Sequence, residues 1–154
     1  WMSQWVFQSK RVITTSDNDM INVQDYQGAD VTREVLSNPN GVLLIVSYDL
    51  EKASTKALNR VIDLGNQATT QYVKTVLLTS SAGHDRNFIA VPAPMHFEFF
   101  NVDDVQLKML VRANPGIVLI KDGVIMGKWS SHELPTVNKL HQMLQNQPAK
   151  SKNA

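Results

Sequence analysis

The sequence has 154 residues, of which 43% are hydrophobic and 19% charged, with a net charge of +1. That length fits one domain with a sizeable core, and the near-neutral charge, without a basic run interleaved with aromatics, argues against a nucleic-acid partner. The absence of cysteine removes disulfides, thiol catalysis and thiolate metal sites, and the longest apolar run, Val42 to Val46, is far shorter than the roughly 18 residues of a membrane helix.

The first forty residues predict short elements. Trp5 to Thr14 is rich in β-branched and aromatic residues, which indicates a strand or a two-stranded ribbon. Asp30 is a suitable N-cap for a short helix over Val31 to Leu36. Asn38-Pro39-Asn40-Gly41 then ends that helix and turns the chain.

The central segment predicts a strand, a long helix and another strand. Val42 to Tyr48 reads as a buried strand near the centre of a sheet. Asp49 is the expected N-cap of the helix that follows, and Glu51 falls in its first turn, where the helix dipole favours an anion. The helix carries one apolar face. Gly65 either ends the helix or weakens its middle, and in the second case Asn66 to Gln71 continue it. Val73 to Thr79 is the next core strand.

A further helix–strand unit follows. Asp85 to Val91 is compatible with a short helix ended by two prolines. Met95 to Phe100 alternates as a strand, with Met95, Phe97 and Phe99 on one side. Val102 to Arg112 predicts a helix that begins near Asp103 or Asp104.

The last part of the chain predicts a β-hairpin and a helix. Asn114-Pro115-Gly116 precedes the apolar strand Ile117 to Ile120, and proline suits the start of a strand because it has no N–H to donate. Asp122-Gly123 is a strong hairpin turn before a return strand, Val124 to Trp129. Leu134 to Gln145 is amphipathic. We also predict a cis peptide between Asn114 and Pro115, since X–Pro bonds adopt that form at small cost.

This order predicts an α/β fold of the thioredoxin-like class, with a central mixed sheet flanked by helices. The added unit over 85–100 is of the kind that the TlpA/ResA and peroxiredoxin branch carries. One domain is expected over residues 1–146, with 1–30 as an N-terminal strand or ribbon extension and 147–154 as a flexible polar tail. Because the chain begins with Trp1, any targeting or membrane segment is expected to lie upstream.

Two stretches resemble a known family: GVLLIVSYDLEKASTKAL, Gly41 to Leu58, and LKMLVRANPGIVLIKDGVIMGKW, Leu107 to Trp129. They are similar to the C-terminal soluble domain of bacterial DoxX-family membrane proteins, in which a thioredoxin-like domain follows a membrane portion. The resemblance covers most of the chain and is looser between Thr70 and Met95. It implies a position on the extracytoplasmic, periplasmic side, tethered to the membrane through a missing upstream segment.

The chain departs from its redox-active relatives at the position of their CxxC motif. By resemblance, that motif falls on Glu51-Lys52-Ala53-Ser54, while Pro115 corresponds to the cis-proline that faces it. A carboxylate and a hydroxyl cannot exchange disulfides, because exchange needs a thiolate. The ligand-binding residues of the resulting groove are expected to be Tyr48, Asp49, Glu51, Ser54, Asn114 and Pro115. The alternative is that Glu51 and Ser54 only cap the helix.

Other chemistry finds little support in the sequence. The four histidines, His84, His96, His132 and His141, form no metal pattern; His96-x-Glu98 would share one strand face but lacks a third ligand. Ser80, Ser81 and His84 contain the residue types of a hydrolase without its nucleophile elbow. No catalytic residue, metal or cofactor is therefore expected.

The sequence thus favours a redox-inactive, non-enzymatic accessory domain of a membrane protein. Its expected partner is a protein or an extended peptide, including the membrane portion of its own full-length protein, and not nucleic acid. The alternative is a substrate-positioning domain of a membrane thiol-disulfide oxidoreductase whose cysteines lie outside this chain. A free-standing hydrolase that uses Glu51 or His84 is a more distant possibility.

Overall fold

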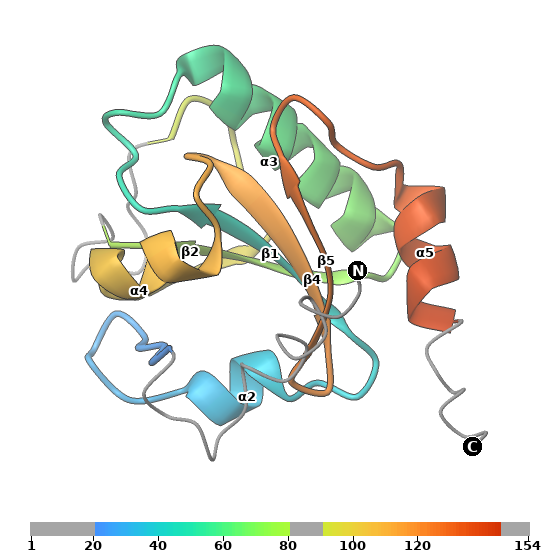
Figure 1. Cartoon of the computed structure of the whole chain (residues 1–154), viewed down its shortest axis with the longest axis horizontal. Coiled ribbons are helices and arrows are strands. Elements are labelled where there is room, and N and C mark those ends of the chain that lie inside the picture. The colour runs from blue at the N-terminus through green and yellow to red at the C-terminus, as the bar shows by residue number, and fades with distance from the viewer. Residues whose placement is uncertain (1–20, 81–90, 146–154) are drawn as a thin grey trace.

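The computed structural model describes residues 21–80 and 91–145, which form a mixed sheet with helices on both faces (Figure 1). The five strands follow the order β3-β2-β1-β4-β5 across the sheet. Their bounds are Val42–Ser47 for β1, Lys74–Thr79 for β2, Glu98–Asn101 for β3, Gly116–Lys121 for β4 and Val124–Ser130 for β5. The predicted central mixed sheet is therefore confirmed.

The centre of the sheet is β1, all six residues of which are buried. It runs parallel to β2, with Leu44 opposite Val76, and antiparallel to β4, with Leu44 opposite Val118. β3 continues the sheet parallel to β2, and β5 returns antiparallel to β4. A strand covered on both faces needs apolar residues at every position, and the sequence of β1 supplies them.

Within the described ranges, four helices cover the sheet: α2 (Thr32–Leu36), α3 (Thr55–Thr70), α4 (Asp104–Leu110) and α5 (Val137–Gln145). Successive side chains of β1 point to opposite faces, so two cores form. Leu44 and Val46 pack in one core with residues of α2 and α4. Leu43 and Ile45 pack in the other with residues of α3 and α5. Partly buried Met95, Phe97 and Phe99 pack against this second core, as their alternation predicted.

α3 approaches the sheet closely at Gly65, in the middle of the helix. A Cβ added there would lie 2.7 Å from the Ile45 Cδ1 and 2.8 Å from the Phe97 Cε2. Glycine normally weakens a helix interior by about 1 kcal/mol relative to alanine. Here it permits a helix–sheet contact that a larger residue would obstruct.

The hairpin follows its sequence signature. Asp122 and Gly123 both have positive φ, 54° and 80°, which is the backbone of a type I′ turn. The Asn114–Pro115 peptide is cis, as predicted.

The start of the long helix differs from the prediction. We expected Asp49 to be its N-cap, but α3 begins at Thr55 with Ser54 as N-cap. The reason is local: the Asp49 carboxylate accepts hydrogen bonds from the backbone N–H groups of Glu51 and Lys52, and the Ala53 N–H donates to the Asp49 carbonyl. Aspartate therefore closes a separate turn ahead of the helix. Glu51 lies in that turn and not in the first turn of α3.

The other predicted helices were also longer than those in the structure. α2 begins at Thr32, with Val31 in the N-cap position, although the Asp30 carboxylate still accepts the Thr32 N–H at 3.0 Å. α4 spans Asp104–Leu110 within the expected 102–112, and its N-cap is Asp103, one of the two aspartates expected near its start. α5 begins at Val137 rather than at residue 134, because a residue that precedes proline is disfavoured in helical conformation.

The strand expected from Met95 is confined to Glu98–Asn101. Asn66 on α3 accounts for the difference. Its side-chain oxygen accepts the His96 N–H at 2.8 Å, and its side-chain nitrogen donates to the Pro94 carbonyl at 3.0 Å. The backbone ahead of β3 is thus bound to the helix instead of to β2.

Some predictions concern residues outside the described ranges. These are the strand or ribbon over residues 5–14, most of the helix predicted over residues 85–91, and the tail over 147–154. The domain boundaries proposed from the sequence therefore stay predictions. Within residues 21–80 and 91–145, none of the helices has the length and hydrophobicity required to span a bilayer.

Candidate functional site

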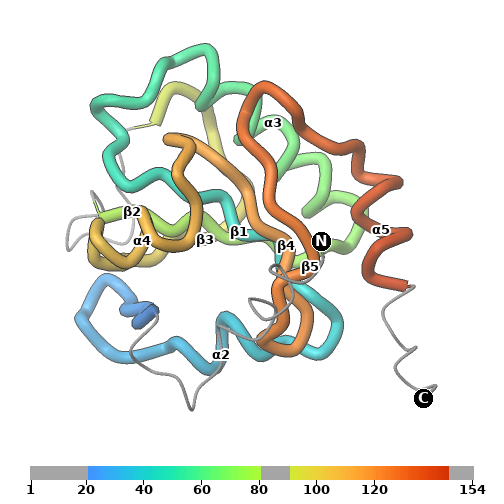
Figure 2. The backbone as a smooth tube through the Cα atoms, viewed as in Figure 1, coloured from blue at the N-terminus to red at the C-terminus, as the bar shows by residue number. Residues whose placement is uncertain are grey.

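The sequence-predicted site lies at the carboxyl end of β1. There the chain leaves the sheet, makes the Asp49–Ala53 turn and enters α3 (Figure 2). The segment that contains Asn114 and Pro115 connects α4 with β4, the antiparallel neighbour of β1. The fold therefore brings together two segments that lie more than sixty residues apart in sequence.

Asn114 joins these two segments through both atoms of its amide. The Ser47 hydroxyl donates to the Asn114 Oδ1 at 2.6 Å. The Asn114 Nδ2 donates to the Asp49 carbonyl at 2.9 Å. Ser47 is fully buried, so its hydroxyl depends on a protein partner. The cis-Pro115 loop is thereby bound both to the end of β1 and to the turn that follows. We call Ser47, Asp49 and Asn114 the Asn114 bridge.

Glu51 and Ser54, which the sequence resemblance places at the cysteine positions of redox-active relatives, do not contribute to this bridge. The Glu51 residue is exposed. The Ser54 hydroxyl accepts the Ala57 N–H at 2.9 Å, and its carbonyl accepts the Leu58 N–H. Ser54 therefore acts as a helix cap, which supports the capping alternative for this residue. Glu51 does not cap α3.

Tyr48 forms the border of the site on the side of α4. Its ring lies beneath Lys108, whose Nζ is 5.0 Å from the ring centroid, within the range of a cation–π contact. The same Nζ lies 3.8 Å from the Asp104 Oδ2. The Ser80 hydroxyl donates to the Tyr48 carbonyl. Lys108 on α4 is thus placed between an aromatic ring and a carboxylate.

The structure adds Ser47, Ser80 and Lys108 to the residues that sequence reasoning proposed. Ser47 ends β1, and Ser80 directly follows β2. Because the carboxyl ends of adjacent parallel strands meet at one edge of a sheet, the positions of these serines were a usable signal. Lys108 lies on a helix surface and gave no such signal.

The surface of the site carries polar groups that can donate and accept hydrogen bonds. It presents the exposed Glu51 carboxylate and the half-buried Tyr48 and Asn114 side chains. Among the described residues, no three His, Asp or Glu side chains are placed to share a metal ion. His96 also lies ahead of β3, so the strand face that it was expected to share with Glu98 does not form.

Comparisons with known proteins identify the fold. No protein-family model matches the sequence, and no curated protein matches it. Among solved structures, the chain is similar to a thioredoxin-like protein from Aeropyrum pernix, with 12% identity, a TM-score of 0.55 and 94% of each chain covered. It is also similar to BsSco, a member of the Sco family of cytochrome c oxidase assembly proteins, with 9% identity, a TM-score of 0.53, and 81% of this chain and 89% of that chain covered.

A third similar structure is a secreted Mycobacterium tuberculosis disulfide oxidoreductase homologous to E. coli DsbE. It has 11% identity and a TM-score of 0.52, and the match covers 81% of this chain and 94% of that chain. Identities this low establish a common fold and not a common activity. Together with the five-stranded mixed sheet and the helices on both its faces, they show that this chain has a thioredoxin-like fold.

Proposed function

We propose that this chain is a redox-inactive interaction domain on a thioredoxin-like scaffold, which binds protein or extended peptide at the carboxyl end of β1. The observation that carries the proposal is the Asn114 bridge. It holds the cis-Pro115 loop against the turn that contains Glu51, although the chain has no cysteine to place there. In this proposal, the segments that surround the redox motif in redox-active relatives are kept, while the motif itself is replaced.

The chemistry of exchange supports the absence of an oxidoreductase activity in the isolated domain. Thiol–disulfide exchange begins with attack by a thiolate on a disulfide sulfur. Neither the Glu51 carboxylate nor the Ser54 hydroxyl supplies one, and the hydroxyl is already used as a helix cap. What remains is a binding surface with the Tyr48 ring, the Glu51 carboxylate and the Pro115 loop.

The cellular setting that we propose follows from the resemblance to DoxX-family proteins. The domain is tethered to a membrane protein through upstream sequence and works on the extracytoplasmic side. The similarity to a secreted oxidoreductase and to a Sco-family assembly protein is consistent with that setting. In this proposal the partner is a polypeptide, which includes the membrane portion of the same full-length protein.

Peptide selection tests the binding proposal. The purified domain should enrich extended peptides from a random displayed library, and the selected peptides should shift the backbone amide resonances of residues 48–54 and 116. Tyr48→Ala and Glu51→Lys should weaken these peptides at least five-fold. The matched control is Tyr72→Ala, because Tyr72 is 96% exposed and lies in the α3–β2 turn. If the selected peptides bind the Tyr48→Ala variant as tightly as the wild type, the assignment of the peptide site to the carboxyl end of β1 is contradicted.

The likeness to a disulfide oxidoreductase motivates a second candidate: a substrate-positioning domain whose cysteines lie elsewhere in the full-length protein. Paired cysteines in upstream membrane helices, together with insulin reduction by the full-length protein but not by this domain, would favour it. Insulin reduction by the cysteine-free domain itself would contradict both candidates.

Restoring the thiols tests whether residues 51–54 occupy the place of the redox motif. Glu51→Cys combined with Ser54→Cys should form an intramolecular disulfide on mild oxidation, because Glu51 lies in the Asp49–Ala53 turn and Ser54, three positions on, is the N-cap of α3. Thiol titration measures the pairing. Leu50→Cys with Ala53→Cys is the control, since both native residues are buried in the core. If the control cysteines pair preferentially, residues 50–53, and not 51–54, would occupy the place of the redox motif.

A further inference from the structure

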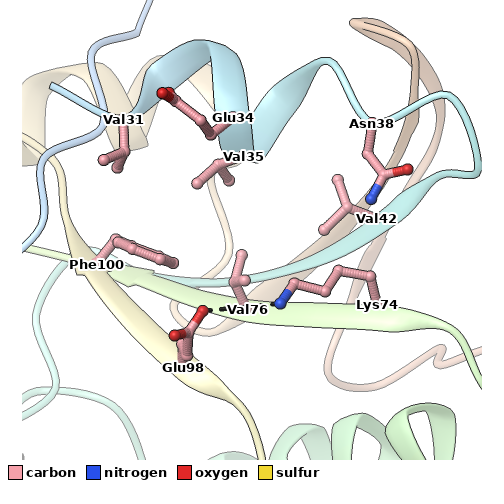
Figure 3. Close-up of a pocket in the computed structure, with 9 residues that line it drawn as sticks. All are labelled: Val31, Glu34, Val35, Asn38, Val42, Lys74, Val76, Glu98 and Phe100. Carbon is pink, nitrogen blue, oxygen red and sulfur yellow. Dashed lines mark ion pairs between the residues drawn. The ribbon is translucent and has the colours of Figure 1, made fainter.

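A pocket lies on the opposite side of the sheet from α3, between α2 and strands β1, β2 and β3 (Figure 3). Its volume is about 230 Å³. Val35, Val42 and Val76 supply apolar walls from the helix and from two strands, and Val31 and Phe100 lie together at one end. The pocket contains none of the residues of the proposed peptide site, so its function is independent of that proposal.

The mouth of the pocket carries more negative than positive charge. Glu34 projects from α2, while Lys74 of β2 and Glu98 of β3 lie across from it (Figure 3). The Lys74 Nζ is 3.7 Å from the Glu98 Oε1. Within the described part of the chain, the Glu34 carboxylate has neither a hydrogen bond nor an ion pair. Among the described residues that line the pocket, the Lys74 ammonium is thus already paired with Glu98, while Glu34 has no such partner.

We propose that this pocket binds a small organic ammonium ion with an apolar body. The apolar body would contact the valine side chains and Phe100, where it is removed from water. The ammonium would remain at the mouth near Glu34, on the side with uncompensated negative charge. A carboxylate of the same shape would meet two carboxylates and an ammonium that already has a partner.

The volume sets the size of this ligand. Pockets for drug-sized ligands and cofactors measure about 300–1,000 Å³, and this one is smaller. One aromatic ring on a two-carbon chain, or a branched alkyl chain of similar size, is therefore the appropriate class. Nucleotides and flavins are too large.

Phenethylammonium is the probe that we choose to test the proposal. In a titration followed by methyl ¹H–¹³C spectra at neutral pH, it should shift the methyl resonances of Val35, Val42 and Val76 in a saturable manner. The reference probe is 3-phenylpropanoate, which has the same ring and a similar length but the opposite charge. It should bind at least five-fold more weakly.

Two variants locate the interaction. Glu34→Gln should weaken phenethylammonium about two- to five-fold, the range of a partly exposed ion pair, and should reduce its advantage over phenylpropanoate. The matched control is Glu133→Gln, an exposed carboxylate in the β5–α5 connection, which should change neither affinity. Val31→Phe, at a half-buried position at the end of the pocket, should weaken both probes at least ten-fold.

The proposal is overturned if phenylpropanoate binds as tightly as phenethylammonium, or if Glu34→Gln leaves the affinity for phenethylammonium unchanged. It is also overturned if the three valine methyls show no saturable shift up to the solubility limit of the probe. Because Glu34 is exposed, its replacement by glutamine keeps the fold intact and leaves the test valid even where Val31→Phe destabilises the protein.

Discussion

Replacing Asn114 with alanine should destabilise the protein by about 2–3 kcal/mol. The substitution removes the acceptor of the fully buried Ser47 hydroxyl and the donor to the Asp49 carbonyl. A buried polar group left without its partner costs about 1–3 kcal/mol. The Asp49 carbonyl keeps the Ala53 N–H as a donor, so its contribution is smaller, about 0.5–1 kcal/mol.

Urea unfolding followed by circular dichroism measures this effect. The midpoint should fall while the m-value stays constant, because the same surface is exposed on unfolding. Asn138→Ala is the matched control, since Asn138 is exposed on α5. It should change the free energy of unfolding by less than about 0.5 kcal/mol.

A double-mutant cycle separates the hydrogen bond from other effects of truncation. Ser47→Ala alone should cost about 1 kcal/mol, and the double variant should be less destabilised than the sum of the single variants by about 1 kcal/mol. Strict additivity, or an Asn114→Ala variant within 0.5 kcal/mol of wild type, would refute the view that the Asn114 bridge holds the two segments together.

Three further predictions follow from local geometry. Gly65→Ala should destabilise by about 1–3 kcal/mol in thermal unfolding, because its Cβ would lie 2.7 Å from Ile45, and a stabilised variant would show that α3 can shift outward. Ser54→Ala should cost about 1 kcal/mol through loss of the α3 cap, whereas Ser54→Asp should retain it; equal costs would contradict the cap assignment. The hydroxyl and the N–H of Thr32 donate to the Asp30 carboxylate and lower its pKa in the folded state. This contribution to stability is complete above the unfolded-state pKa, about 4, and is lost as the pH falls through the lower folded-state pKa. Acid titration of unfolding should therefore show a steeper loss of stability below about pH 4 for wild type than for Asp30→Asn; identical profiles would exclude this linkage.

Periodicity and turn chemistry determined most of the fold. A strand that is apolar at every position, such as 42–46, has to be covered on both faces, so its central place could be predicted. Asp122-Gly123 adopts positive φ readily, which fixed the hairpin. Cysteine content, read directly from the sequence, decided that this chain supplies no thiolate.

Tertiary structure decided the rest, because the competing choices are nearly equal in local energy. Asp49 and Ser54 are both good caps. The local hydrogen bonds of the Asp49 turn are joined by one from the Asn114 Nδ2, which comes from a loop more than sixty residues away and stabilises that turn ahead of α3. Asn66 likewise takes the His96 N–H that a longer β3 would have used. The pocket beneath α2 depends on the packing of a short helix over three strands, which no single stretch of sequence encodes.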